Sequence, residues 1–131
     1  MTLVDTSVWI EFFKGGDHWS KERLKAMIHD RESIAYIDYI LLEIIQGVRE
    51  RTDREKLNER FESYVLLNPQ RSTVLLAAEI YQEIQRKGFK IRSIVDGLIA
   101  ATAIETVCPV LHKDRDFDKI AEYYPLKVVQ K

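Results

Sequence analysis

The chain has 131 residues, a net charge of −1 and a pI near 6.3, with 46% hydrophobic and 31% charged residues. These values are typical of one globular domain covering residues 1–131, they exclude disordered and membrane-embedded classes, and they require any nucleic-acid contact to be local. Cys108 is alone and cannot form an internal disulfide, and Asp5 and Glu11 interrupt any secretory apolar segment, so we expect a cytoplasmic protein without membrane spans.

Short apolar strands and helices alternate along the chain. Thr6 or Ser7 is expected to cap the first helix, Asp38 to cap a later one, and Val74 to share the apolar face of the helix over 71–87 with Ala77. This alternation predicts an α/β domain with a mostly parallel sheet of about five strands. The expected strands cover 1–5, 33–37, 64–67, 110–111 and 126–129, and the expected helices cover 8–14, 17–30, 39–51, 52–63, 71–87, 93–106 and 116–123.

Four acidic residues stand beside apolar or small residues: Asp5, Glu43, Asp96 and Asp114. An unpaired carboxylate in such a setting is costly, and a cation is a common partner. Asp5 and Asp114 follow strands directly, which places both at the carboxyl edge of a parallel sheet, where sites of open α/β folds lie. If the fold gathers all four, the chain contains a site for a hard metal ion.

Each acid also has a structural interpretation. Asp5 is a good helix cap, and Glu43 lies on a mixed helical stripe that, judged alone, favours a solvated face. Asp96 lies on a small-residue face, where it reaches either an ion pair with Arg92 or a buried cation. One aspartate of the 114–118 segment is expected to cap the final helix, which leaves Asp114 and Asp116 as alternatives for the fourth acid.

The order of these motifs resembles the PIN-domain ribonucleases and, within them, the VapC-type toxins of prokaryotic toxin–antitoxin pairs. The matching segments span nearly the whole chain: Val4–Ile10, Leu42–Arg49, Val95–Ala103 and Leu111–Phe117. One departure is His112, where the family often has Thr or Ser, so a hydroxyl contact to the site is replaced by an imidazole contact or lost.

The resemblance implies a three-layer α/β/α domain and an Mg²⁺- or Mn²⁺-dependent endoribonuclease toxin. Its acidic quartet would be Asp5, Glu43, Asp96 and Asp114, with Thr6, Ser7, Asp116 and His112 as accessory residues. A cluster of carboxylates without His or Cys suits Mg²⁺ or Mn²⁺ rather than zinc, and such metals activate water and clamp the phosphate oxygens. The metal-free cluster should have raised carboxylate pKa values. The resemblance also implies products with 5′-phosphate and 3′-hydroxyl ends, a homodimer and a VapB-type antitoxin that blocks the acidic groove.

Local basic residues could bind the RNA at the rim of this site. The candidates are Arg49, Arg86, Lys87 and Arg92, and the alternative is an ordinary solvated helix surface. The aromatic residues Trp9, Phe12 and Phe13 have a helical spacing that favours packing over base stacking. Two other functions remain open: a catalytically inactive PIN-fold module that binds RNA or a partner, and a structure-specific DNA nuclease.

Overall fold

The computed structural model describes all 131 residues and confirms the α/β order of the elements. Asp5 separates the first strand from the first helix, and Asp114 separates the last strand from the last helix. The strands are β1 (Thr2–Val4), β2 (Ile34–Tyr36), β3 (Val65–Leu66) and β4 (Val110–Leu111). The helices are α1 (Thr6–Lys14), α2 (Trp19–His29), α3 (Asp38–Ile45), α4 (Arg51–Phe61), α5 (Arg71–Arg86), α6 (Ile94–Thr106) and α7 (Arg115–Ala121).

The four strands form one parallel sheet in the order β3-β2-β1-β4. Because β1 pairs with β4 through Val4 and Leu111, the last residue of each strand, the carboxyl ends of these two strands lie side by side. The strand expected at 126–129 is reduced to a single parallel bridge between Val128 and Val110. β4 is only two residues long, so it offers a fifth strand little length to pair with.

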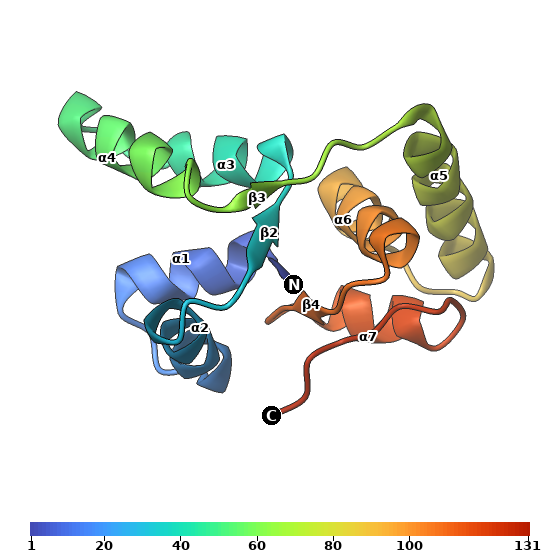
Figure 1. Cartoon of the computed structure of the whole chain (residues 1–131). Helices are drawn as coiled ribbons and strands as arrows, with labels where there is room; N and C mark the ends of the chain where they lie inside the picture. Colours follow the sequence, from blue (N-terminus) through green and yellow to red (C-terminus); the bar gives the residue numbers. More distant parts are fainter.

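Helices flank the sheet on both sides, as Figure 1 shows, with α1 to α4 as one group and α5 to α7 as the other. The strands β1, β2 and β4 bury their apolar side chains between the two groups, and Trp9 of α1 is fully buried against Phe61. Burial of this apolar surface is the main source of the protein's stability. Because the core is closely packed, it also holds the residues at the carboxyl edge of the sheet in fixed positions.

Several helix boundaries and faces differ from expectation. α3 ends at Ile45, before the turn at Gly47, instead of continuing to residue 51, and its cap is Ile37 instead of Asp38. On α5 the buried side chains are Thr73, Ile80 and Ile84, whereas Val74 is 54% exposed. The apolar period placed Val74 on the wrong side because α5 is covered on one narrow face only, mainly by α6.

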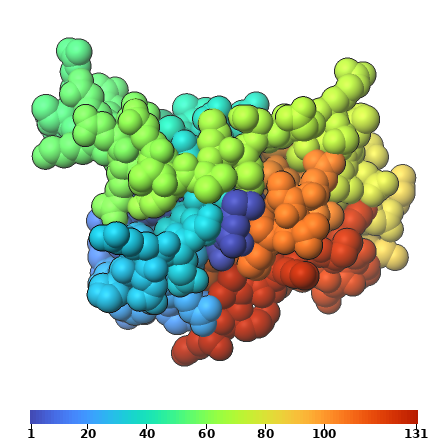
Figure 2. Space-filling view, in the orientation of Figure 1, coloured from blue at the N-terminus to red at the C-terminus, as the bar shows by residue number.

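α4 projects from the body of the molecule, at the upper left of Figures 1 and 2. Phe61, at its last position, is the one buried residue of this helix. α4 is therefore held mainly at its C-terminal end. None of the seven helices combines the length and apolar character needed to cross a bilayer.

Candidate metal centre

Asp5 occupies the junction of β1 and α1 and serves as the cap of α1. Its backbone N–H donates to the carbonyl of Leu111 at 2.9 Å, which ties it to the end of β4. Its Oδ2 accepts hydrogen bonds from the backbone N–H of Ser7 at 3.0 Å and from Ser7 Oγ at 2.5 Å. The expectation that Thr6 or Ser7 caps this helix was therefore wrong, because the preceding carboxylate takes that place. Oδ1 of Asp5 remains free for another partner.

Asp96, Asp114 and Asp116 form an acidic cluster beyond β4. One carboxylate oxygen of each lies within 4.8 Å of the others. Asp96 lies in the first turn of α6, and Asp114 caps α7 by accepting the N–H of Asp116 at 3.0 Å. The first helical turn favours negative charge in both cases.

Asp116 provides a test of whether this cluster suits a cation. Its side chain is fully buried, and its Oδ1 has no hydrogen-bond partner. A buried carboxylate oxygen without a partner is costly, and buried polar groups are almost always satisfied. An all-oxygen donor set with one orphaned oxygen matches the preference of Mg²⁺ and Mn²⁺. The residues present therefore fit such an ion.

Arg92 supplies positive charge at the edge of the cluster. Its Nη2 donates to Asp114 Oδ1 at 3.0 Å, its Nε lies 3.9 Å from Asp116 Oδ2, and its backbone N–H donates to the same Oδ2 at 3.1 Å. The structural alternative at Asp96, an ion pair with Arg92, is replaced by one with Asp114. Arg92 is thus engaged with the acids, whereas the sequence suggested it as an RNA contact.

Two carboxyl groups have raised pKa values, as expected for clustered acids. Burial raises the pKa of Asp5 to about 6, against the lowering effect of its bonds to Ser7. Burial also raises the pKa of Asp96 to about 8, and repulsion from Asp5 and Asp114 adds to this shift. Both shifts mean that the cluster resists full ionisation without a counter-ion, which a divalent cation would supply.

Glu43 is connected to the site through Thr6. Thr6 Oγ1 donates to Glu43 Oε1 at 2.8 Å, which joins α3 to the start of α1. Glu43 is half-buried and lies close enough to Asp5 to raise the pKa of that carboxyl. It does not belong to the compact group of Asp96, Asp114 and Asp116.

Lys113 and Glu11 form an ion pair that the sequence did not suggest. Lys113 Nζ lies 2.5 Å from Glu11 Oε1, and the backbone N–H of Lys113 donates to Ser7 Oγ at 3.1 Å. Glu11 is 9% exposed, and the bond to Lys113 lowers its pKa. These bonds fasten the segment before Asp114 to α1.

His112 turns away from the cluster. Its Nε2 lies 3.2 Å from Asp118 Oδ1, and its ring packs on Phe117 with centroids 5.1 Å apart. Burial lowers its pKa, and its Nδ1 has no hydrogen-bond partner. The imidazole thus contacts Asp118, whose side chain is exposed to solvent.

The other basic candidates lie on exposed helix ends. Arg86 is paired with Glu83 at 3.0 Å, and Lys87 lies 4.0 Å from the same carboxylate. Arg49 is exposed in the turn between α3 and α4. Of the aromatic residues in α1, Trp9 is buried and Phe12 is partly buried, in line with packing, whereas Phe13 is 41% exposed.

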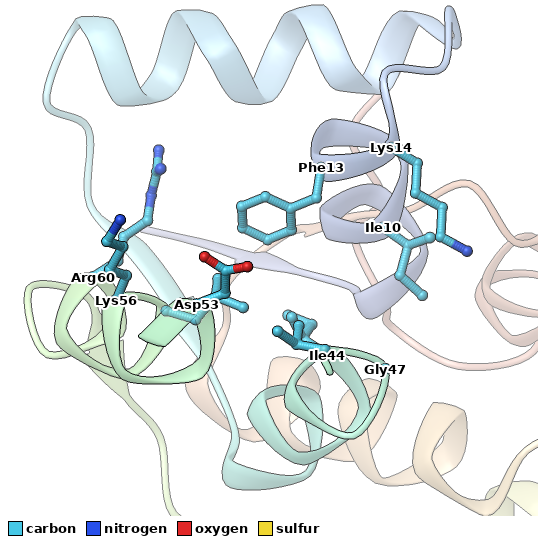
Figure 3. Close-up of a pocket in the computed structure, with 10 residues that line it drawn as sticks. Ile10, Phe13, Lys14, Ile44, Gly47, Asp53, Lys56 and Arg60 are labelled. Carbon is cyan, nitrogen blue, oxygen red and sulfur yellow. The ribbon is translucent and has the colours of Figure 1, made fainter. Parts of the chain in front are cut away.

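A groove of about 410 Å³ opens between α1, α3 and α4. Figure 3 shows Ile10 and Phe13 of α1 facing Ile44, with Asp53, Lys56 and Arg60 of α4 along the other side. The acidic cluster does not line this groove, so the molecule has an acidic centre and a separate apolar groove with a basic rim.

Comparisons with known proteins agree with this geometry. A model of the PIN domain family matches residues 2–123. Ribonuclease VapC11 of Mycobacterium tuberculosis is 34% identical over 123 residues, which cover 92% of this chain and 92% of that protein. The solved structure of FitAcB from Neisseria gonorrhoeae has a TM-score of 0.75 at 21% identity and covers 99% of this chain and 97% of that chain. VapBC-1 from nontypeable Haemophilus influenzae has a TM-score of 0.76 at 16% identity and covers 98% of this chain and 96% of that chain.

Proposed function

The chain belongs to the PIN-domain family and, within it, to the VapC ribonucleases, and from this premise we propose that it is a metal-dependent endoribonuclease toxin controlled by a VapB-type antitoxin. One observation carries the proposal: Asp96, Asp114 and Asp116 converge beyond β4, with the buried Oδ1 of Asp116 unpartnered. A fold can host many activities, so the argument rests on these residues as well as on the family.

The residues divide by task. Asp96, Asp114 and Asp116 would hold Mg²⁺ or Mn²⁺, and Asp5 adds its free Oδ1 from the adjacent strand end. When bound, such an ion lowers the pKa of water and neutralises charge on the phosphate. Glu43, held by Thr6, would accept a proton or orient the attacking water. The result would be cleavage of an RNA phosphodiester bond by water.

Cleavage of single-stranded RNA with and without divalent metal tests the activity. We expect cleavage with Mg²⁺ or Mn²⁺ that stops in excess EDTA, and a loss of at least about a hundredfold in Asp96→Asn and Asp116→Asn, because a metal ligand is removed. Asp17→Asn, which changes an exposed acid in the α1–α2 turn, is the matched control and should retain full activity. Full activity in EDTA or in both cluster variants would refute the proposal.

The same assay separates the two alternatives. An inactive binding module would retain RNA without metal-dependent cleavage, and a structure-specific DNA nuclease would prefer flap DNA to RNA in parallel reactions. End analysis of the RNA products should find 5′-phosphate and 3′-hydroxyl groups. This outcome follows from attack by water on the phosphorus with departure of the 3′-oxygen.

The apolar groove of Figure 3 is our candidate seat for the antitoxin. The solved neighbours include VapBC complexes, so their toxins were captured with a partner chain. Ile10, Phe13 and Leu57 offer apolar contacts, and Lys56 and Arg60 outnumber Asp53 along α4. We propose that an apolar segment flanked by acidic residues occupies the groove, because its charge complements this rim.

Neutralisation assays test this seat. Leu57→Asp should leave RNA cleavage unchanged and weaken inhibition by a coexpressed antitoxin, because a charge in an apolar contact is strongly unfavourable. Equal inhibition of this variant and the parent protein would show that the antitoxin does not bind in this groove. The homodimer stays a prediction, and light scattering of the toxin with and without antitoxin measures it.

A further inference from the structure

Three cations and two aromatic rings form a cluster at the C-terminal end of α5 and along α7. Arg115 and Lys119 each lie 5.7 Å from the ring centre of Phe89, and Lys87 lies 5.4 Å from that of Tyr123. Lys119 also lies 5.9 Å from Tyr123. We call these five residues the basic–aromatic track. Cation–π contacts at these distances hold long side chains in place without neutralising them.

The track begins at the acidic centre. Arg115 stands between Asp114 and Asp116, at the first position of α7. Lys119 follows one helical turn later, and Tyr123 lies four residues beyond it, past the end of α7. Residues four apart share a helix face, so the stripe leads away from the acids along α7. The helical part from Arg115 to Lys119 rises about 6 Å, and Tyr123 extends the stripe past the end of α7.

Part of the charge on the track is available to a ligand. Arg115 is exposed and has no ion-pair partner, and the nearest acid to Lys87 is Glu83 at 4.0 Å. Lys119 is paired at 3.1 Å with Glu122, the residue that follows the end of α7. Tyr123 is 44% exposed, so its ring can accept a base as well as a cation. Phosphate-binding cations interleaved with exposed rings are the usual elements of single-strand binding surfaces.

We propose that the basic–aromatic track binds the single-stranded flank of the RNA substrate and guides the scissile phosphate to the acidic centre. Arg115, Lys119 and Lys87 contact phosphates, and Tyr123 stacks on a base. The inference rests on the proposed ribonuclease function and deepens it, because it selects single-stranded RNA and the side from which the strand enters. The acids repel phosphate by themselves, so a nearby cationic surface also accounts for attraction despite the net charge of −1.

Binding of a fluorescent single-stranded RNA, measured by anisotropy in the Asp96→Asn background, tests the track without cleavage. The triple variant Lys87→Gln, Arg115→Gln, Lys119→Gln should bind about a hundredfold more weakly at 0.1 M salt and lower the salt slope by about two. Removing three charges elsewhere, in Lys21→Gln, Lys25→Gln, Lys127→Gln, should change affinity by less than about threefold.

Tyr123 tests the stacking separately. Tyr123→Ala should weaken RNA binding about tenfold, and Tyr123→Phe should bind like the parent, because the ring and not the hydroxyl makes the contact. Circular dichroism and thermal melting of every variant show whether the fold is kept. If the triple glutamine variant were to misfold, Arg115→Gln alone should weaken binding about fivefold.

Each other outcome overturns the inference. Equal RNA affinity of the triple variant and the parent would show that the track does not bind RNA. Equal affinity of the parent for duplex and single-stranded RNA would exclude selectivity for single strands. Loss of antitoxin binding with unchanged RNA binding would assign the surface to a protein partner. Failure of the proposed function looks different: the parent would bind RNA through the track and show no metal-dependent cleavage.

Discussion

Replacing Asp5 by asparagine should stabilise the metal-free protein and weaken the stabilisation that the protein gains from bound metal. Asp5 is 3% exposed, and burial raises the pKa of its carboxyl group from 3.8 to about 6. Folding therefore disfavours its charged form at neutral pH. Asparagine imitates the protonated acid and caps helices as well as aspartate does, so the hydrogen bond from Ser7 N–H to this cap can persist.

The size of the gain follows from the pKa shift. A shift of about two units corresponds to about 3 kcal/mol of unfolding free energy at pH 8, where Asp5 is ionised in both states. For a chain of 131 residues, this is an increase of about 10 °C in Tm. The native state keeps a proton that the unfolded state loses between pH 3.8 and about 6, so parent stability falls across that window. The advantage of Asp5→Asn should be absent below it and complete above it.

Thermal melting in EDTA at pH 4.5, 5.5, 7 and 8 measures this difference. Asp17→Asn, an exposed acid, is the control and should melt like the parent throughout. With Mg²⁺, the parent should gain stability by mass action and Asp5→Asn should gain less. A variant that is less stable than the parent at pH 8 in EDTA, or whose advantage does not change with pH, would show that Asp5 carries no desolvation penalty.

Three further predictions concern the surroundings of the acids. Glu11→Gln or Lys113→Met should lower kcat for RNA cleavage about tenfold, because either change loosens the segment before Asp114, whereas Lys113→Arg should retain kcat. In steady-state kinetics, a lower kcat at an unchanged KM would support a role of this ion pair in positioning Asp114. An unchanged kcat would contradict it. Arg92→Gln should bind Mg²⁺ about fivefold more tightly in calorimetry, because a competing cation is removed, and weaker binding would refute this. Gly16→Ala should lower the unfolding free energy by about 1–3 kcal/mol in chemical denaturation, because its Cβ would lie 1.3 Å from Glu11 Oε2, and an unchanged midpoint would exclude the clash.

Local sequence patterns predicted several of the strands and helices correctly. Apolar triplets predicted β1 and β2, and the run of small residues predicted α6, which in the structure begins one residue later, after Ser93 as its cap. The strand expected at 126–129 failed because strand formation depends on the partner, and β4 offers only two residues. Periodicity also misplaced Val74, since it identifies an apolar stripe but not the neighbour that covers it.

The sequence predicted those acids of the centre whose place follows from the end of a strand or the start of a helix. Asp5 and Asp114 follow from the sheet rule, and Asp96 from its small-residue face. The full burial of Asp116 could not be predicted from the sequence, because it depends on which aspartate caps α7 and on how α7 packs against the rest of the protein. The Lys113–Glu11 contact joins residues 102 positions apart, and no local pattern encodes such a pairing.

The projecting helix α4 has a consequence for motion. A helix with one buried side chain, Phe61, gains little from tertiary packing, and isolated helices of this length are marginal in water. Its amide protons should exchange with solvent far faster than those of the buried α6, through local opening that leaves the sheet intact. Four of the ten residues that line the proposed antitoxin groove lie on α4, the helix with the fewest buried side chains. A partner that fills the groove would order α4 at the moment of binding, and slowed exchange confined to residues 51–61 would be its signature.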